Sequence, residues 1–195
     1  AFGSGSAEAG SYGFSPLYGG TTAADKTSVY GYPCAPFLPG SPSQFYNEER
    51  GMRGGGSIII HAATNVNVLG VLETKGCRKT VYTQAVGCTG GGVWLAAPDI
   101  TLADTATISA NGEESNSAGG AYGKGGGGRI ALTRVASEDE LATLVSGEIP
   151  PKMVVSDYVN PNVTATSPKP ENNGTVKQAL SGNLSATLAT QSNIP

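Results

Sequence analysis

Three carboxylates are the side chains of this sequence best suited to acid–base chemistry. Asp99 and Asp104 lie five residues apart, and we expect Glu73 to lie near Ser109 when the internal repeats are aligned. Cleavage of a glycosidic bond needs two carboxyl groups about 5–9.5 Å apart, and a lyase needs a base with a cation or metal. No two acids fall on matching positions of adjacent repeats. We therefore predict no enzyme, and polysaccharide cleavage ranks third among the functional hypotheses.

Two other features with chemical potential have simpler structural interpretations. His61 is the only histidine, and no second ligand stands beside it, so we expect a strand residue that faces a covering loop. The stretch GKGGGGR lacks the Lys-Ser/Thr ending and the following helix of a phosphate-binding loop. We expect its last residue, Arg129, to open a strand and end a ladder. The sequence predicts no metal and no cofactor.

These side chains must be positioned by a glycine-led pattern that occurs three times in the middle of the chain. It reads GGGSIII, GGGVWL and GGGGRIAL, and Gly56, Gly92 and Gly128 recur at a spacing of 36 residues. The same spacing superposes the later segments VLETKG and TISANG. Two landmarks with one offset indicate a structural repeat. Alternating apolar residues predict strands in the second half of each unit, and the run Ile58–Ile60 predicts a strand buried on both faces.

Alignment at this spacing places apolar residues in columns. The expected columns are Ile58 with Trp94 and Ile130, Ile59 with Leu95 and Ala131, and Ile60 with Ala96 and Leu132. Parallel strands about 4.8 Å apart stack like residues in this way, and the glycines suit corners where the backbone turns or approaches another backbone closely. We therefore predict an all-β fold, a short right-handed parallel β-helix of about three coils, with Trp94 in the core rather than in a sugar-binding platform.

The same residues resemble a known family. GGGSIII with its closing glycine, GGGVWL with TISANG, and AYGKGGGGRIAL are similar to the glycine-rich β-helix repeats of large secreted and cell-surface proteins in bacteria and protists. The preceding GSYGFSPLYGG and YPCAPFLPGS are similar to the loop segment before the first strand of such modules. The resemblance covers about residues 11–134, and the chain leaves the pattern after Thr133. It implies the pectin-lyase-like superfold and a surface or matrix role, without a catalytic motif.

Composition divides the chain into three parts. Residues 1–53 form an irregular Gly/Pro/aromatic wrap, residues 54–134 the glycine-rich repeats, and residues 135–195 a short capping helix, a polar linker and a C-terminal strand. Prolines at the density found in the first part exclude regular elements. We expect this wrap to cover the outer apolar face of the first strands at Ile58–Ile60.

The C-terminal part carries clear signals for individual elements. Ser137 with Glu140 is a capping box that predicts a short helix over 138–146. Placed at the end of the stack, this helix would cover exposed ladder groups. The alternative for this segment is a degenerate fourth turn of the repeat. A strand is predicted over 152–159 and another over 175–189. The last strand can fold back on its own domain or add to the edge of another copy, and the sequence does not decide between these alternatives.

The cysteines and the glycosylation sequons suggest covalent chemistry. Cys77 and Cys88 lie at the two bases of one loop, so we predict a disulfide between them that contributes about 2–3 kcal/mol. Cys34 is left over. Sequons make Asn162, Asn173 and Asn183 candidate glycosylation sites, although a chain this rich in Asn, Ser and Thr contains such triplets by chance.

Composition also bounds the environment and the partners. Only 14% of the 195 residues are charged and 29 are Gly, a balance typical of extracellular β-structure. The net charge of −3, with no basic stripe, predicts no nucleic-acid partner. No apolar run approaches the ~20 residues of a transmembrane helix. The chain begins at Ala1 rather than Met, which we interpret as a mature or trimmed product.

The leading hypothesis is therefore a structural extracellular or cell-surface protein, a subunit that assembles head to tail into a fibre or filament. Self-association into a homopolymer would use β-helix stacking or the exchange of a strand or segment. The candidate assembly residues are Tyr12, Phe14, Tyr18, Leu184 and Leu188. The alternative is a carbohydrate-binding or adhesive surface module, with glycans as partners, in which the loops at 77–90 and 113–126 form one recognition face.

Overall fold

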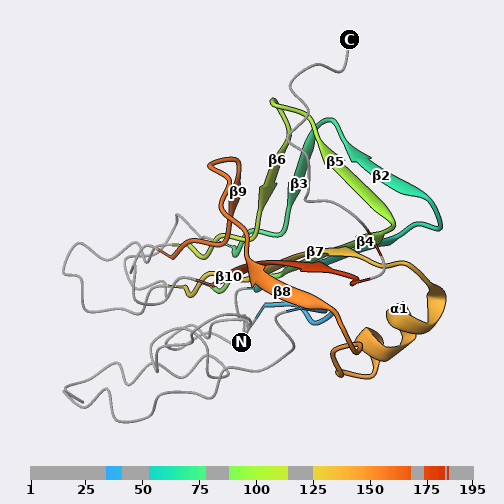
Figure 1. Ribbon diagram of the computed structural model, residues 1–195. Coiled ribbons are helices and arrows are strands. Elements are labelled where there is room, and N and C mark those ends of the chain that lie inside the picture. Colours follow the sequence, from blue (N-terminus) through green and yellow to red (C-terminus); the bar gives the residue numbers. More distant parts are fainter. Residues whose placement is uncertain are drawn as a thin grey trace, which may run out of the picture.

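The computed structural model describes residues 34–40, 53–77, 88–113, 125–167, 174–182 and 184. They contain ten strands and one helix, α1 (Glu138–Val145), arranged as Figure 1 shows. The strands are β1 (Ser57–His61), β2 (Asn65–Val68), β3 (Val71–Glu73), β4 (Gly92–Ala97), β5 (Asp99–Leu102), β6 (Thr107–Ser109), β7 (Arg129–Arg134), β8 (Val154–Asp157), β9 (Val163–Thr164) and β10 (Thr175–Leu180).

The strands form three sheets that lie at angles to one another (Figure 1). The largest has the order β1-β4-β7-β10-β8, the second is β2-β5, and the third is β3-β6-β9. All neighbours pair parallel except β8 and β10, which pair antiparallel. Strands from successive repeats therefore lie side by side, and each of the first two repeats contributes one strand to each sheet in turn.

One apolar core lies between the three sheets. Strands of all three sheets contribute to it, because alternate residues of every strand except β8 point inward. Its fully buried members include Val93, Ile100, Ile108 and Ile130. A second, smaller cluster covers the outer face of the five-stranded sheet, where residues around Cys34 and α1 pack on Trp94 and Ala131. The middle strands β4 and β7 are consequently buried on both faces.

The expected fold class, an all-β right-handed parallel β-helix of about three coils, is wrong. The described residues form a mixed α/β arrangement of three separate sheets with parallel and antiparallel pairing, together with one helix. The departure begins after β7, where the chain enters α1 instead of adding a third strand to the β2–β5 sheet. The chain then returns as β8, which runs antiparallel to β10.

The predicted columns are also wrong by one residue at β4. Ile59 lies opposite Trp94 and Trp94 lies opposite Ala131, whereas the constant spacing placed Trp94 beside Ile58 and Ile130. A slip of one residue moves a side chain to the other face of a sheet. Trp94 therefore leaves the central core and joins the outer cluster, where its Nε1 donates a hydrogen bond of 3.0 Å to Thr133 Oγ1. It is buried, as predicted.

The covering segment lies over different strands from those expected. Within the wrap, the described segment 34–40 packs on Trp94 and Ala131 through Cys34 and Ala35 rather than on Ile59 of β1. Thr133 Oγ1 donates to the carbonyl of Cys34 at 3.3 Å and helps to hold the segment there. Ile59 of β1 remains exposed. The prediction of burial on both faces thus applies to the neighbouring strands β4 and β7, and it is wrong for Ile58–Ile60.

The helix α1 confirms the predicted element and corrects its position. Ser137 is the N-cap, and its hydroxyl accepts a hydrogen bond from the Glu140 backbone N–H at 3.3 Å. The Glu140 carboxylate accepts from the Ala136 N–H at 2.7 Å, one residue before the N-cap. Leu144 anchors the helix in the outer cluster. The helix therefore covers the outer face of the five-stranded sheet and does not lie over the end of a ladder.

The C-terminal strand folds back on its own chain. β10 inserts between β7 and β8 and pairs with both, so the self-folding alternative holds for residues 175–180. The strand is shorter than predicted, because the Leu184 N–H donates to the Ser181 carbonyl in a turn. The predicted polar linker contains β9, whose Val163 is buried in the central core.

Glycines set the distance between successive layers of the five-stranded sheet. A Cβ atom added to Gly91 would lie 1.8 Å from the Gly56 carbonyl oxygen, one added to Gly128 would lie 2.0 Å from the Gly91 oxygen, and one added to Gly174 would lie 1.7 Å from the Gly128 oxygen. Real Cβ contacts are much longer, so only glycine permits this approach. Gly174 extends the glycine column one layer beyond the repeat found in the sequence.

Replacement of Gly91 by alanine should destabilise the fold by about 3 kcal/mol or more, because the methyl group meets a backbone carbonyl that cannot rotate away. Gly56→Ala is the matched control: it lies in the same glycine-led pattern, but its added Cβ would have no atom within 4 Å. We expect this control to change stability by less than about 0.5 kcal/mol. Urea unfolding followed by Trp94 fluorescence measures both, and equal losses would contradict the close-contact explanation.

Candidate functional site

The first three strands form one exposed end of the molecule. Among the described residues, β1, β2 and β3 each pair with a neighbour on one side only. Large apolar side chains are exposed along them, at Ile59, at Leu69 and at Val71, which is 69% exposed. An exposed strand edge with apolar side chains can template pairing with another chain. We name these residues, Ser57 to Glu73, the first edge.

A second group of exposed apolar residues lies beyond the last parallel layer. Val154 is 64% exposed on β8, the strand at the other edge of the five-stranded sheet, and Val159 follows it. Val145 and Ile149 lie at and after the end of α1. We name residues 145–159 the second edge. Every large hydrophobic residue found exposed in the described ranges belongs to one of these two edges, and β4 to β7 contribute none.

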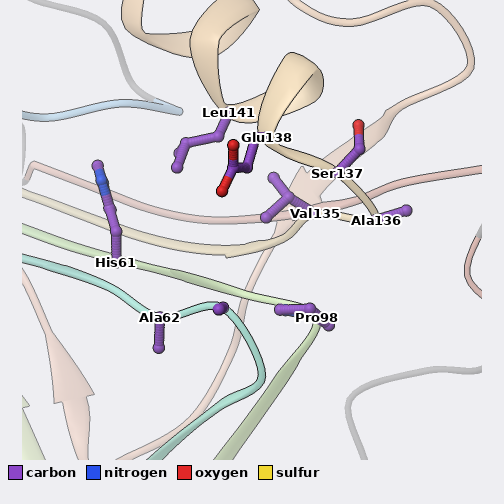
Figure 2. A pocket seen from close by; sticks show the side chains of 9 residues that line it. His61, Ala62, Pro98, Val135, Ala136, Ser137, Glu138 and Leu141 are labelled. Carbon is purple, nitrogen blue, oxygen red and sulfur yellow. The ribbon is translucent and has the colours of Figure 1, made fainter.

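A pocket of ≈ 390 Å³ adjoins the first edge, where β1 ends beside the N-terminus of α1. Figure 2 shows His61 rising from β1 and the Glu138 carboxylate extending from α1 toward the same space. The remaining lining is mainly apolar and consists of Ala62, Ala63, Pro98, Val135, Ala136, Ser137 and Leu141. The pocket thus combines one imidazole and one carboxylate with an apolar wall, and can accept a small side chain or ligand group.

His61 contacts Trp94 instead of facing a covering loop. The ring centroids are 4.4 Å apart with an interplanar angle of 78°, an edge-to-face arrangement. Although the residue as a whole is exposed, this contact removes water from one side of the imidazole. The resulting desolvation lowers the pKa of His61 from its ordinary value. The ring is therefore neutral at pH 7, which suits an apolar pocket wall.

The carboxylates considered for catalysis do not form one cluster, and none of them lines this pocket. Glu73 lies opposite Ser109, as the repeat predicted. Asp99 begins β5 and forms a 3.7 Å ion pair with Arg134. Asp104 is exposed, and its backbone carbonyl accepts a hydrogen bond from Asn162 Nδ2 at 2.9 Å. The structure does not bring these three acids together. No group of three or more side chains suited to a metal ion occurs in the described ranges.

The predicted Cys77–Cys88 disulfide is absent. Cys77 is exposed whereas the Cys88 side chain is buried, so the two sulfurs lie in different surroundings. A disulfide requires both Cβ atoms to face each other within about 4.5 Å. The Cys88 backbone instead belongs to the stacked layers, since its carbonyl accepts from the Glu113 N–H at 3.0 Å. Cys34 is a buried thiol as well.

The remaining predicted site residues fall into two groups. Asn162 precedes β9, and its side chain is engaged with Asp104, so it has a structural role at this position. Leu184 lies in the turn after β10 and is partly buried. Residues 78–87 and 114–124, which make up most of the proposed recognition loops, lie outside the described residues. The same is true of the remaining candidate site residues, which are Tyr12, Phe14, Tyr18, Asn173, Asn183 and Leu188.

One charged residue, Arg129, is buried, which the sequence analysis does not predict. Arg129 opens β7 as expected, but it is only 3% exposed and its Nε has no hydrogen-bond partner among the described residues. The alternation Arg129, Ala131, Thr133 was the available signal. All three residues lie on one face, and that face is covered by residues 34–40.

Comparisons with known proteins give no identification. No family model, curated protein or solved structure matches the chain. The resemblance to glycine-rich repeat modules therefore stays a prediction. Within the ranges that the structure describes, no helix has the length and the apolar character needed to cross a membrane.

The lowered pKa of His61 has a measurable consequence for stability. As the pH falls below about 6.5, the unfolded chain takes up a proton on this histidine before the folded chain does, so the folded state loses stability. At higher pH the effect is absent. We expect the melting temperature to fall between pH 7 and pH 5, and His61→Gln to flatten this decline. His61 is the only histidine, so the difference between the wild type and His61→Gln reports on this side chain alone. The carboxylates that titrate at lower pH are present in both proteins and affect both melting temperatures alike.

A histidine NMR titration provides the direct check. A pKa for His61 at or above that of a model peptide, or identical pH profiles for the two proteins, would contradict desolvation by Trp94.

Proposed function

We propose that this chain is a structural building block, extracellular or displayed at a cell surface, whose copies associate end to end through the first edge and the second edge. The observation that supports it is the distribution of exposed apolar side chains. Ile59, Leu69 and Val71 lie at one limit of the layered strands and Val154 and Val159 at the other, whereas β4 to β7 in between carry none. Burial of this surface against another copy is the available source of free energy.

The backbone of the first edge is suited to the same purpose. The outward sides of β1, β2 and β3 present N–H and C=O groups that the described residues do not pair in a sheet. Proteins that stay monomeric usually place charges or prolines along such an edge. Strands β1 to β3 carry a single charged residue, Glu73, among aliphatic and small polar side chains. Strand addition from a neighbouring copy would satisfy these groups.

A head-to-tail arrangement uses both edges, whereas a symmetric dimer uses only one. Pairing of two first edges would leave Val154 and Val159 exposed in the product. Contact between the first edge of one copy and the second edge of the next buries both sets. It also leaves a new edge of each kind at the ends, so the assembly can grow. This arrangement favours a fibre or filament over a closed dimer.

Light scattering over a concentration series tests the proposal. We expect a mass above that of one 19.6 kDa chain that rises with concentration. Val71→Lys should raise the concentration needed for association by at least about tenfold, because burial of one unpaired charge costs more than the 1.4 kcal/mol that this factor represents. Thr105→Lys, at an exposed turn between β5 and β6, is the control and should associate normally. A wild-type protein that stays monomeric throughout would contradict the proposal.

A mixing experiment separates the two arrangements. In a head-to-tail assembly, Val71→Lys blocks the first edge and Val154→Lys blocks the second, so each variant alone stays monomeric. A mixture of the two should form a dimer and stop there, since each partner retains one working edge. In a symmetric dimer, Val154→Lys would associate like the wild type. That result would exclude head-to-tail growth while leaving association through the first edge intact.

A further inference from the structure

Arg129 places a positive charge inside the outer cluster of the protein. It is the first residue of β7 and is only 3% exposed. Ala131 and Thr133, on the same face of the strand, contact the segment around Cys34. Alternation along the strand directs the Arg129 side chain to this covered face. The guanidinium is therefore held between the sheet and the segment formed by residues 34–40.

This guanidinium lacks the negative partner that a buried charge requires. Among the described residues, its Nε–H donates to no partner, and none of their ion pairs includes Arg129. The group carries five N–H donors and does not deprotonate under ordinary conditions. Burial of such a group without an anion is strongly unfavourable. A structure that keeps it buried implies that something negative balances it.

A second polar group without a partner lies directly beside it. Thr175 of β10 is the register partner of Arg129, and its Oγ1 is also buried with no hydrogen-bond partner among the described residues. Register partners on adjacent parallel strands lie about 4.8 Å apart. On the other side of Arg129 the register partner is Gly92, whose missing side chain leaves room for the carbonyl oxygens of Pro36 and Leu38, so an anion has room only on the Thr175 side. A charged donor group and a hydroxyl thus lie side by side, both unsatisfied.

The local charge around these groups is positive. Lys177 follows Thr175 on the same face of β10, and its Nζ pairs with the exposed Asp157 at 2.6 Å. Burial raises the pKa of the Cys34 thiol, and Lys177 and Arg129 both act against that rise. Both cations therefore lie close enough to Cys34 to influence it. Asp157 offsets the charge of Lys177, which leaves Arg129 without compensation.

We propose that Arg129 and Thr175 bind an oxyanion, such as a carboxylate, sulfate or phosphate group, between β7 and β10 beneath residues 34–40. A guanidinium holds two oxygens of such a group through parallel N–H donors. The Thr175 hydroxyl supplies a further donor, and Lys177 adds attraction at longer range. The site lies in the outer cluster between β7 and β10, uses none of the exposed apolar residues of either edge, and does not depend on the association proposed above.

Thermal unfolding in different sodium salts tests this site. The melting temperature is measured in chloride, sulfate, phosphate and acetate at equal ionic strength and low millimolar anion concentration. We expect at least one oxyanion to raise the melting temperature of the wild type above its value in chloride. A response to sulfate or phosphate alone indicates a free tetrahedral ion, and a response to acetate indicates a carboxylate.

Two variants connect any shift to the proposed residues. Arg129→Met should abolish the difference between oxyanion and chloride, and should be at least as stable as the wild type in chloride, because an apolar side chain replaces an uncompensated charge. Thr175→Val keeps the charge and removes the hydroxyl, so it should weaken anion affinity about fivefold in calorimetric titration, the loss expected for one hydrogen bond. This second variant keeps the test valid if Arg129→Met fails to fold.

Two results would overturn the proposal. One is a wild-type melting temperature that is the same in all four salts. The other is a rise in melting temperature on addition of sulfate that is as large for Arg129→Met as for the wild type. That result would show the general stabilisation that excluded salts give to any protein.

Discussion

The contact on which the structure depends is the approach of a glycine backbone to a carbonyl of the preceding layer. Gly91, Gly128 and Gly174 each lie against such a carbonyl, and the residue that follows each of them donates its N–H to the same oxygen. Gly92, Arg129 and Thr175 begin or enter their strands at that point. One contact per layer therefore sets both the layer separation and the register of β4, β7 and β10, and the apolar core follows from that register.

The sequence predicted the glycine-led strands and the helix α1, because their signals are local. Three adjacent glycines followed by aliphatic residues, or a serine three residues before a glutamate, need no knowledge of distant parts of the chain. Register could not be predicted in this way. Val71 and Thr107 pair at the spacing of the repeat, but Val66 pairs with Ile100, two residues short of it. The turns within a repeat differ in length from one repeat to the next. One constant spacing between repeats therefore does not give the register of each strand pair.

The site residues were harder to predict than the strands, because exposure depends on what covers a strand. The sequence could not show that residues 34–40 lie over β4 and β7 and leave Ile59 in contact with solvent. For the same reason the sequence predicts that Arg129 ends a ladder. In the structure the ladder continues, because Thr175, the first residue of β10, pairs next to Arg129. Gly174 stands alone in its segment, so no cluster marked the additional layer.

The spatial order β7-β10-β8 differs from the order in which these strands leave the ribosome. β8 is made before β10 but contacts the sheet only through it, so residues 154–157 have no sheet partner until residue 180 is available. During vectorial synthesis the outer edge of β7 must remain open while about 40 further residues emerge, a long-range closure of the kind that slows folding. A nascent chain of this protein therefore completes its largest sheet last, and premature termination before β10 would release a product with β7 uncovered.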